Sequence, residues 1–232
     1  MTRWHVFLAL VAVLALAVVV LARSSARALE GLQSVSGRAL RWNVVASQSL
    51  VAVVVLAGAW ATGVPWTAFG WSGLPAASTG TVERLLVGVG LGVAITSGNL
   101  ALERVVDAGA LREAAALRRK LAPETPVAWA NLLLLTIPII AISEELLFRG
   151  AMVGALAVGF DVSPWALAVV ASLAFGAAHT AQGWIGVTVT ATFGFVLAAA
   201  FVLTHDLVVV VVAHAVVDAV EFLHHEGPHS AR

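Results

Sequence analysis

Two adjacent carboxylates and an arginine lie in a stretch of the chain that is otherwise apolar. Glu144, Glu145 and Arg149 are the charged residues of the segment 127–159. A charged side chain within a bilayer costs at least a few kcal/mol and is rarely found there without a partner or a function. Glu145 and Arg149 are four residues apart, so they can pair on one face of a helix. Adjacent helical residues diverge by about 100°, so Glu144 would point elsewhere, toward a cavity.

Two later segments place a histidine in an apolar run. His179 follows Phe175 by four residues, and His214 precedes Asp218 by four, so that the last two share a helix face. Carboxylates and imidazoles together can activate a water molecule and stabilise an oxyanion, which is the chemistry of peptide hydrolysis. The same residue types also form proton relays within membranes.

The composition is that of a polytopic membrane protein. Of 232 residues, 60% are hydrophobic and 11% are charged, whereas soluble domains are about half apolar and about a quarter charged. The formal net charge is zero, so nothing suggests a nucleic-acid partner. Cysteine is absent from the sequence, which excludes disulfides and thiolate ligands or nucleophiles. Any metal would have to be bound by histidine and carboxylate.

The apolar stretches predict an all-α transmembrane bundle of about seven spans, or eight if the fourth region is split. The predicted spans are residues 4–22, 43–62, 82–102, 127–159, 164–181, 184–204 and 206–223. The first is longer than a usual signal-peptide core and is followed directly by Arg23, so we expect an uncleaved span. We expect three regions along the chain: an N-terminal three-span region with amphipathic connectors (1–126), a catalytic core (127–223) and a polar tail (224–232).

Basic residues predict the orientation in the membrane. Most of them lie in the connectors 24–41 and 103–125. Because such connectors stay in the cytoplasm, the N-terminus should lie outside and the C-terminus inside. The second connector should form an amphipathic surface helix that ends near Pro123.

Gly88 and Gly92 in the third span are four residues apart and predict a close-packing face for a neighbouring helix. A dinucleotide-binding fingerprint is excluded, because no strand precedes these glycines.

Helix geometry predicts that the three polar motifs meet. If 127–159 is one tilted or kinked helix, Glu144 lies about 22 Å below its outer end, and His179 lies about 23 Å below the start of its own span. His214 is shallower, at about 12 Å, a difference that helix tilt can absorb. Pro138 removes one backbone hydrogen bond and allows a kink just before the carboxylates.

The order and spacing of these motifs resemble a known family, the CPBP proteins (CAAX-protease and bacteriocin-processing proteins, also called the Abi family). The motifs that carry the resemblance are Glu144-Glu145-x-x-x-Arg149, Phe175-x-x-x-His179 and His214-x-x-x-Asp218. The likeness covers roughly 127–223, and the first three spans carry no signature. The third motif of the family often ends in Asn. Asp218 can accept but not donate a hydrogen bond when it is ionised, which argues against an oxyanion-donor role.

The resemblance implies an intramembrane endopeptidase acting on a membrane-associated protein or peptide, in the lipid bilayer of a bacterial or archaeal cell. Relatives among the CAAX prenyl proteases remove the C-terminal tripeptide of prenylated proteins. The expected catalytic residues are Glu144, Glu145, His179, His214 and Asp218. We assign Glu144 as the general base and His179 as the residue that binds or polarises the water.

Supporting roles and the metal follow from the same motifs. Arg149 and Phe175 would support the site, with Arg149 fixing its neighbouring carboxylate. Zinc is an open question, because His179, His214 and Glu144 could form a three-ligand site with an open position for water. The family has been described both as metalloprotease and as glutamate protease.

Two other classes of function stay open. A proton- or ion-coupled transporter would use the same residue types, but the internal inverted repeat that would favour it is not found. A catalytically inactive binding protein is the other class. The expected residue is present at every motif position, which argues against this class. A purely structural interpretation of Glu144, Glu145 and Arg149 is a buried ion-pair cluster that holds helices together.

Overall fold

The computed structural model describes residues 1–31, 36–71, 79–105 and 112–227, and these parts of the chain form helices and turns without a strand. The long helices are α1 (Trp4–Gly31), α2 (Gly37–Thr62), α3 (Thr79–Glu103), α9 (Gly183–Thr204) and α10 (Leu207–Glu226). The shorter ones are α4 (Arg112–Leu121), α8 (Pro164–Ala177) and the 3₁₀ helices η1 (Trp66–Phe69) and η4 (Thr180–Gln182). The fourth apolar region comprises α5 (Pro126–Asn131), the π-helix η2 (Leu132–Thr136), α6 (Ile137–Glu145), the π-helix η3 (Leu146–Ala155) and α7 (Leu156–Phe160).

Six helical stretches in the described ranges are long and apolar enough to cross a membrane. A seventh apolar helix, α8, is shorter. The prediction of an all-α polytopic bundle is therefore confirmed. The fourth region is one continuous 35-residue helix, not two.

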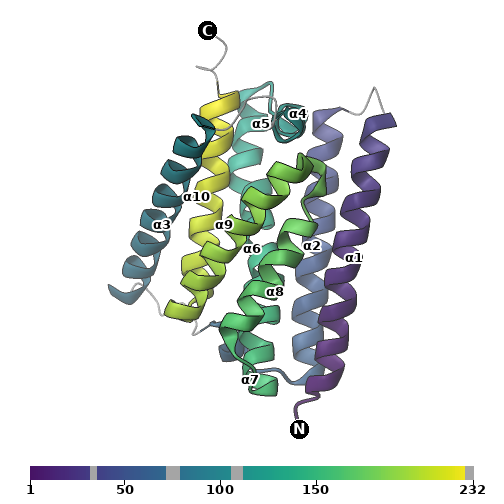
Figure 1. Ribbon diagram of the computed structural model, residues 1–232, viewed down its shortest axis with the longest axis vertical. Helices are drawn as coiled ribbons and strands as arrows, with labels where there is room; N and C mark the ends of the chain where they lie inside the picture. The colour runs from purple at the N-terminus through teal and green to yellow at the C-terminus, as the bar shows by residue number, and fades with distance from the viewer. Residues whose placement is uncertain (32–35, 72–78, 106–111, 228–232) are drawn as a thin grey trace.

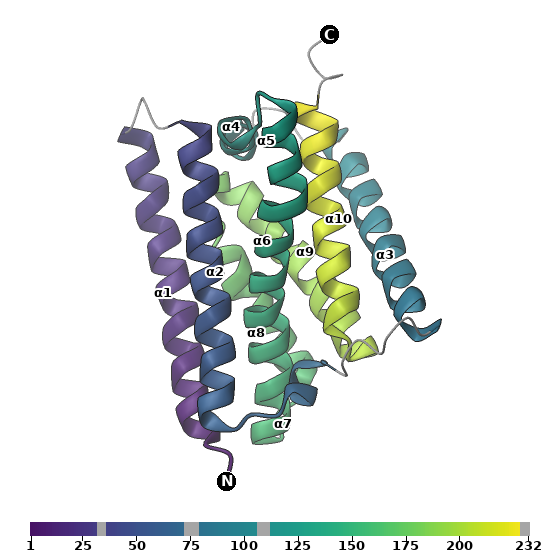
Figure 2. The same cartoon turned by 180° about the vertical axis from the view of Figure 1, so that it is seen from behind.

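The helices run up and down, and the two termini lie at opposite ends of the bundle (Figure 1). The central helix α5–α7 lies between α2 and α10, with α1 and α3 further out on either side (Figure 2). The amphipathic helix α4 covers one end, which we call the α4 end; the helix ends joined by the first basic connector lie there too (Figure 1). Arg41 of α2 donates to the Leu121 carbonyl of α4 at 2.9 Å, so the two basic segments meet at one end, as their charge predicted.

The two helices that the first basic connector joins at this end extend further than predicted. The segment 24–41 was expected to be a polar connector between two spans, but α1 continues to Gly31 and α2 already starts at Gly37. The Ser36 side chain explains the early start, since it accepts a hydrogen bond from the Ala39 amide at 3.2 Å and caps the helix. Helix α4 ends at Leu121, before Pro123, in agreement with the prediction.

The glycines of α3 pack against α10. A Cβ atom at Gly88 would lie 2.8 Å from the Val209 carbonyl, and one at Gly92 would lie 2.8 Å from the Ala213 carbonyl. Only glycine allows two helix backbones to approach this closely. The predicted close-packing face is confirmed, and its partner is the helix that carries His214.

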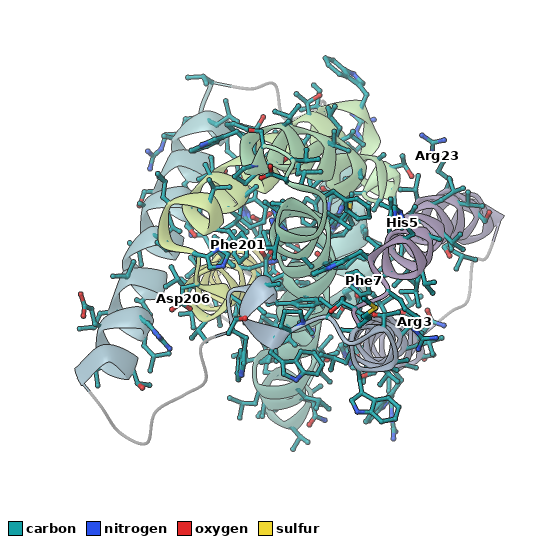
Figure 3. All side chains as sticks on the ribbon, turned by 90° about the horizontal axis from the view of Figure 1, so that it is seen from below. Arg3, His5, Phe7, Arg23, Phe201 and Asp206 are labelled. Carbon is teal, nitrogen blue, oxygen red and sulfur yellow. The ribbon has the colours of Figure 1, made fainter. Side chains whose placement is uncertain are left out.

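The N-terminal end of the bundle is closed by a turn. The region 63–81 was predicted as loop, and its described part contains η1, whose Phe69 is buried. Phe69 meets Phe7 of α1 edge to face, with ring centroids 5.9 Å apart, and Phe7 is labelled in the view from this end (Figure 3). Gly154 of η3 allows η1 to pack closely against it, because a Cβ at this position would overlap the Ala68 carbonyl.

Helix α8 is shorter than predicted. It ends at Ala177 after 14 residues, about 21 Å, whereas the hydrocarbon of a bilayer is about 30 Å thick. His179, expected inside a span that reaches 181, therefore lies in the turn between α8 and η4. Gly183, with φ of 73°, then lets the chain reverse into α9. Non-helical backbone at membrane depth is tolerated where protein covers it or where it lines a cavity.

Orientation can be tested cleanly, because the chain has no native cysteine. Single-cysteine variants Thr67→Cys and Glu124→Cys place a thiol on exposed positions at the N-terminal and α4 ends. With the α4 end in the cytoplasm, a membrane-impermeant maleimide should label Thr67→Cys in intact cells and Glu124→Cys only after lysis. The reverse pattern would show that the orientation taken from the basic connectors is inverted.

Candidate active site

The predicted motifs meet inside the bundle, where the end of α6, the tip of α8 and one face of α10 come together. Glu144 and Glu145 are the last residues of α6, and the π-helix η3 begins at the next residue. Wide π turns inside α-helices are rare and often occur at functional sites. The sequence predicted a kink near Pro138, and the π-helix η2 just before it fits that prediction. No feature of the sequence predicted the second π-helix, η3.

Glu145 is fully buried and links two motifs. Its Oε1 atom accepts a hydrogen bond from Arg149 Nη1 at 2.8 Å and lies 2.7 Å from His214 Nδ1. A carboxylate can only accept, so Nδ1 carries the proton of this hydrogen bond. In a neutral imidazole the other nitrogen, Nε2, is then an acceptor that faces the site. Glu145 thus orients His214.

Arg149 is 1% exposed in its side chain and is surrounded by partners. Besides its bond to Glu145, its Nη2 donates to the Gly194 carbonyl of α9 at 2.8 Å. Its guanidinium carbon lies 4.6 Å from the centre of the Phe175 ring, a cation–π distance. Gly194 has no side chain, and a Cβ there would lie only 3.4 Å from Arg149 Nη2. The predicted pair of Glu145 and Arg149 therefore exists, and α8 and α9 supply the rest of its surroundings.

His179 is held by the end of its own helix. Its Nδ1 lies 2.8 Å from the Phe175 carbonyl, one of the last carbonyls of α8, which also accepts a hydrogen bond from the Ala178 amide at 3.2 Å. A carbonyl can only accept, so Nδ1 donates and Nε2 is left as an acceptor. The Phe175 ring lies 4.6 Å from the imidazole, centroid to centroid. Phe175 therefore touches both Arg149 and His179, in keeping with the supporting position predicted for it.

Glu144 is positioned by α2, a helix that carries none of the three motifs. Gln48 of α2 donates from Nε2 to Glu144 Oε1 at 2.7 Å. The Gln48 carbonyl in turn accepts a hydrogen bond from the Ser143 hydroxyl, which fixes the direction of the amide. A primary amide in the middle of the apolar span 43–62 was the available signal, because such groups in membranes bond to neighbouring helices.

The second oxygen of Glu144 faces both histidines. Its Oε2 is buried without a hydrogen-bond partner among the described residues and lies 3.9 Å from His179 Nε2 and 3.8 Å from His214 Nε2. Asp218 Oδ2 lies 3.6 Å from His214 Nε2. All five residues predicted as catalytic are thus gathered around one point, each from the element on which its motif lies.

The donor set has the chemistry that zinc prefers, namely two imidazole nitrogens and a carboxylate, with both Nδ1 atoms bonded to acceptors that orient the rings. Its spacing is wider than a zinc polyhedron, in which ligands at 2.0–2.1 Å lie about 3.3 Å from one another. In the described part of the chain, three ligand atoms within 4.8 Å of one another occur instead in Glu103, Glu221 and His225. There Arg118 already binds Glu221 at 2.7 Å.

Comparison with protein families gives a match over the segment that carries the motifs. Residues 126–220 match the model of a family described as Type II CAAX prenyl endopeptidase Rce1-like. The matched segment contains all three motifs, and it confirms the resemblance to the CPBP, or CAAX-protease, family. It supports an intramembrane protease of the CAAX type as the general class. No curated protein and no solved structure matches the chain at a significant level.

The bond from Gln48 gives a testable prediction. Gln48→Leu removes the donor to Glu144, and a hydrogen bond to a charged group contributes about 1.5–3 kcal/mol. We expect the rate constant of peptide cleavage to fall by about 10-fold or more. The matched control is Ser47→Ala, because Ser47 is exposed and its hydroxyl donates to the Val44 carbonyl of its own helix. A Gln48→Leu protein that cleaves at the normal rate would show that this amide does not position the carboxylate.

Proposed function

We propose that the protein is an intramembrane endopeptidase in which Glu144 activates a water molecule held between Glu144, His179 and His214. The observation that carries this proposal is the spacing of three polar atoms. Glu144 Oε2 is buried and lies 3.8–3.9 Å from the two Nε2 atoms. These separations are too long for direct hydrogen bonds and are typical of groups bridged by water.

Each residue has a defined task in this mechanism. Glu144 accepts a proton from the water as its oxygen attacks the peptide carbonyl carbon, and His179 Nε2 accepts the water's other hydrogen. When the tetrahedral intermediate collapses, the C–N bond breaks and Glu144 gives the proton to the leaving amine. His214, when protonated, donates from Nε2 to the developing oxyanion, and Asp218 balances that charge from 3.6 Å away.

Glu145, Arg149 and Phe175 hold these groups without touching the substrate. Glu145 accepts a hydrogen bond from Nδ1 of His214, and Arg149 donates to the same carboxylate oxygen. If zinc is bound here, His179, His214 and Glu144 would hold it, and it would supply an acidified water. Rigid support of this kind is what a catalytic constellation needs for accurate placement.

The substrate we propose is a membrane-associated protein or peptide, because the site lies inside a bundle of helices that are long and apolar enough to cross a membrane. The test uses purified protein in liposomes, incubated with prenylated and unprenylated membrane-bound peptides and followed by mass spectrometry. Elemental analysis and a chelator arm of the same assay decide metal dependence. Cleavage that is absent for all peptides, together with a proton flux that depends on Glu144, would replace the protease with a transporter.

A further inference from the structure

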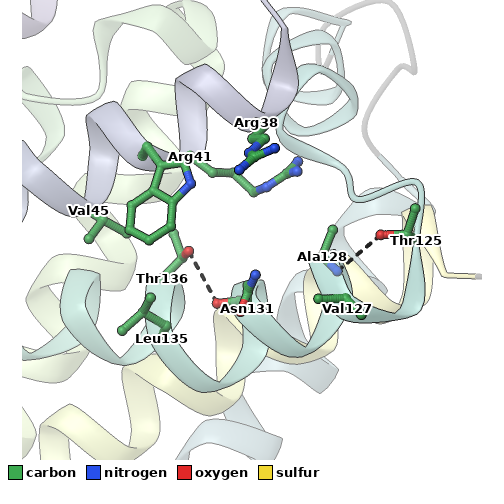
Figure 4. Close-up of a pocket in the computed structure, with 10 residues that line it drawn as sticks. Arg38, Arg41, Val45, Thr125, Val127, Ala128, Asn131, Leu135 and Thr136 are labelled. Carbon is green, nitrogen blue, oxygen red and sulfur yellow. Dashed lines mark hydrogen bonds between the residues drawn. The ribbon is translucent and has the colours of Figure 1, made fainter.

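A cavity of about 280 Å³ lies at the α4 end, between α2 and the start of the central helix (Figure 4). Arg38 and Arg41 of α2 lie on one side of it, and Asn131 of the central helix lies on the other (Figure 4). Val45 and Leu135 are among the apolar residues that line it. The cavity therefore combines cationic groups with apolar walls, and this combination suits an amphipathic molecule with an anionic head.

The two arginines have N–H groups available for an anion. Arg41 uses its Nη1 atom for the Leu121 and Ala122 carbonyls at 2.9 and 3.3 Å, which fixes the direction of its guanidinium. A guanidinium has five N–H donors, so Arg41 has donors besides these. In the described part of the chain, no carboxylate forms an ion pair with Arg38 or Arg41. Two neighbouring guanidinium groups of this kind match the geometry of a phosphate.

The surface around the cavity is one that faces lipid. Trp42, which lines the cavity, is 52% exposed, and Val127 on the opposite wall is 71% exposed. Large apolar side chains stay exposed further along both helices, at Leu50 of α2 and Leu134 of the central helix. On helices that are long and apolar enough to cross a membrane, such a surface contacts acyl chains. Tryptophan is enriched at the level of the lipid headgroups, so the arginines beside Trp42 lie where a phospholipid carries its phosphate.

The charge at this end of the bundle also favours an anionic lipid. Helix α4, which covers it, has Arg118, Arg119 and Lys120 in its last turn. The described residues that line the cavity include two arginines and no carboxylate. Basic pockets between membrane helices are typical binding sites for the headgroups of anionic lipids.

We propose that this cavity binds one anionic phospholipid, with its phosphate held by Arg38 and Arg41 and the start of an acyl chain against Val45 and Leu135. The lipid contacts both α2 and the central helix, and Arg41 already joins α2 to α4. Its binding therefore stabilises the packing of these three elements. Gln48 lies two turns further along α2, so the lipid supports the helix that positions the proposed general base. The lipid is a partner and not a substrate, so this inference does not depend on the peptidase function.

The test measures lipid binding directly, by native mass spectrometry of the full-length protein after it has been stripped of lipid in detergent. The probes are phosphatidylglycerol, which is anionic, and phosphatidylcholine, which carries a compensating cation, with identical acyl chains. We expect phosphatidylglycerol to bind at least about 10-fold more tightly, as for a charge-assisted pair that no cation of the ligand offsets. Arg38→Gln and Arg41→Gln should each reduce this preference. Inorganic phosphate at millimolar concentration should not displace the lipid, because it has no acyl chain.

The controls separate the cavity from the basic surface around it. Arg41→Gln also loses bonds to α4, so Arg38→Gln, a change at an exposed arginine, carries the test if the first variant does not fold. Arg119→Gln removes an exposed charge of α4 outside the cavity and should keep the preference. Equal binding of the two lipids, or a preference that Arg38→Gln leaves unchanged, would overturn the site. An equal loss in Arg119→Gln would do the same, because binding would then follow the overall basic surface. Displacement by inorganic phosphate would overturn the lipid as the occupant.

Discussion

Glu144→Gln should lower the rate of peptide cleavage by at least about 100-fold, the usual contribution of a general base. The amide keeps the size of the side chain, and its oxygen can still accept the bond from Gln48. It cannot take a proton from water at neutral pH. The variant should therefore fold, bind substrate and fail to turn it over. Single-turnover kinetics with the purified protein in liposomes, together with its thermal unfolding temperature, measure both parts of this expectation.

The matched control for this prediction is Glu83→Gln, which neutralises an exposed carboxylate on α3. That variant should cleave at the normal rate. His179→Ala should also be severely impaired, because it removes a second partner of the water. Near-normal cleavage of a confirmed substrate by both Glu144→Gln and His179→Ala would remove the site assignment altogether.

Arg149→Ala should prevent stable folding, which is a larger effect than loss of activity alone. The change leaves Glu145 as a buried carboxylate without its guanidinium, opens a cavity beside Phe175 and frees the Gly194 carbonyl. Removing one partner of a buried ion pair costs about 3–5 kcal/mol, a large part of the stability of a typical domain. We expect a sharp drop in the yield of monodisperse protein on size-exclusion chromatography and a lower unfolding temperature in detergent.

A double variant distinguishes the loss of a charge partner from a general packing defect. Glu145→Gln combined with Arg149→Met removes both charges and keeps similar volumes, so it should fold better than Arg149→Ala. It should still be inactive, since His214 loses the carboxylate that orients it. A stable and active Arg149→Ala protein would contradict the supporting role given to this residue.

The parts of the site that follow from helix periodicity could be predicted from the sequence. The four-residue spacing of Glu145 and Arg149 predicted an ion pair, and Arg149 Nη1 lies 2.8 Å from Glu145 Oε1. The rise per residue of a helix predicted that Glu144 and His179 lie at the same depth, and Glu144 Oε2 lies 3.9 Å from His179 Nε2. A membrane leaves the chain few choices besides the helix, so distance along the sequence becomes distance in space.

Two parts of the site were missed, one because it depends on a contact between distant segments and one because it depends on a turn. Gln48 lies 96 positions from Glu144, and no local pattern links them. The end of α8 before His179 was missed because residues 164–181 are apolar enough to continue as a helix. The helix ends instead in a local turn, in which His179 Nδ1 bonds back to the Phe175 carbonyl. Side-chain bonds to the nearby backbone compete with further helical turns, and the apolar character of the segment does not reveal them.

The hydrogen bond from Gln48 also bears on how the protein can be dissected. The segment that matches the family begins at 126, yet Glu144, the proposed general base, accepts a hydrogen bond from Gln48 of α2. Val55 and Ala59 of that helix are buried in the same core as Leu147. A fragment that starts at 126 would lack α2, so the residues that pack against α2, such as Leu147, would be exposed to lipid. The Glu144 side chain would also lose the hydrogen bond that fixes its direction. The catalytic segment is thus not a portable module, and transplanting it into another scaffold requires α2 to be carried with it.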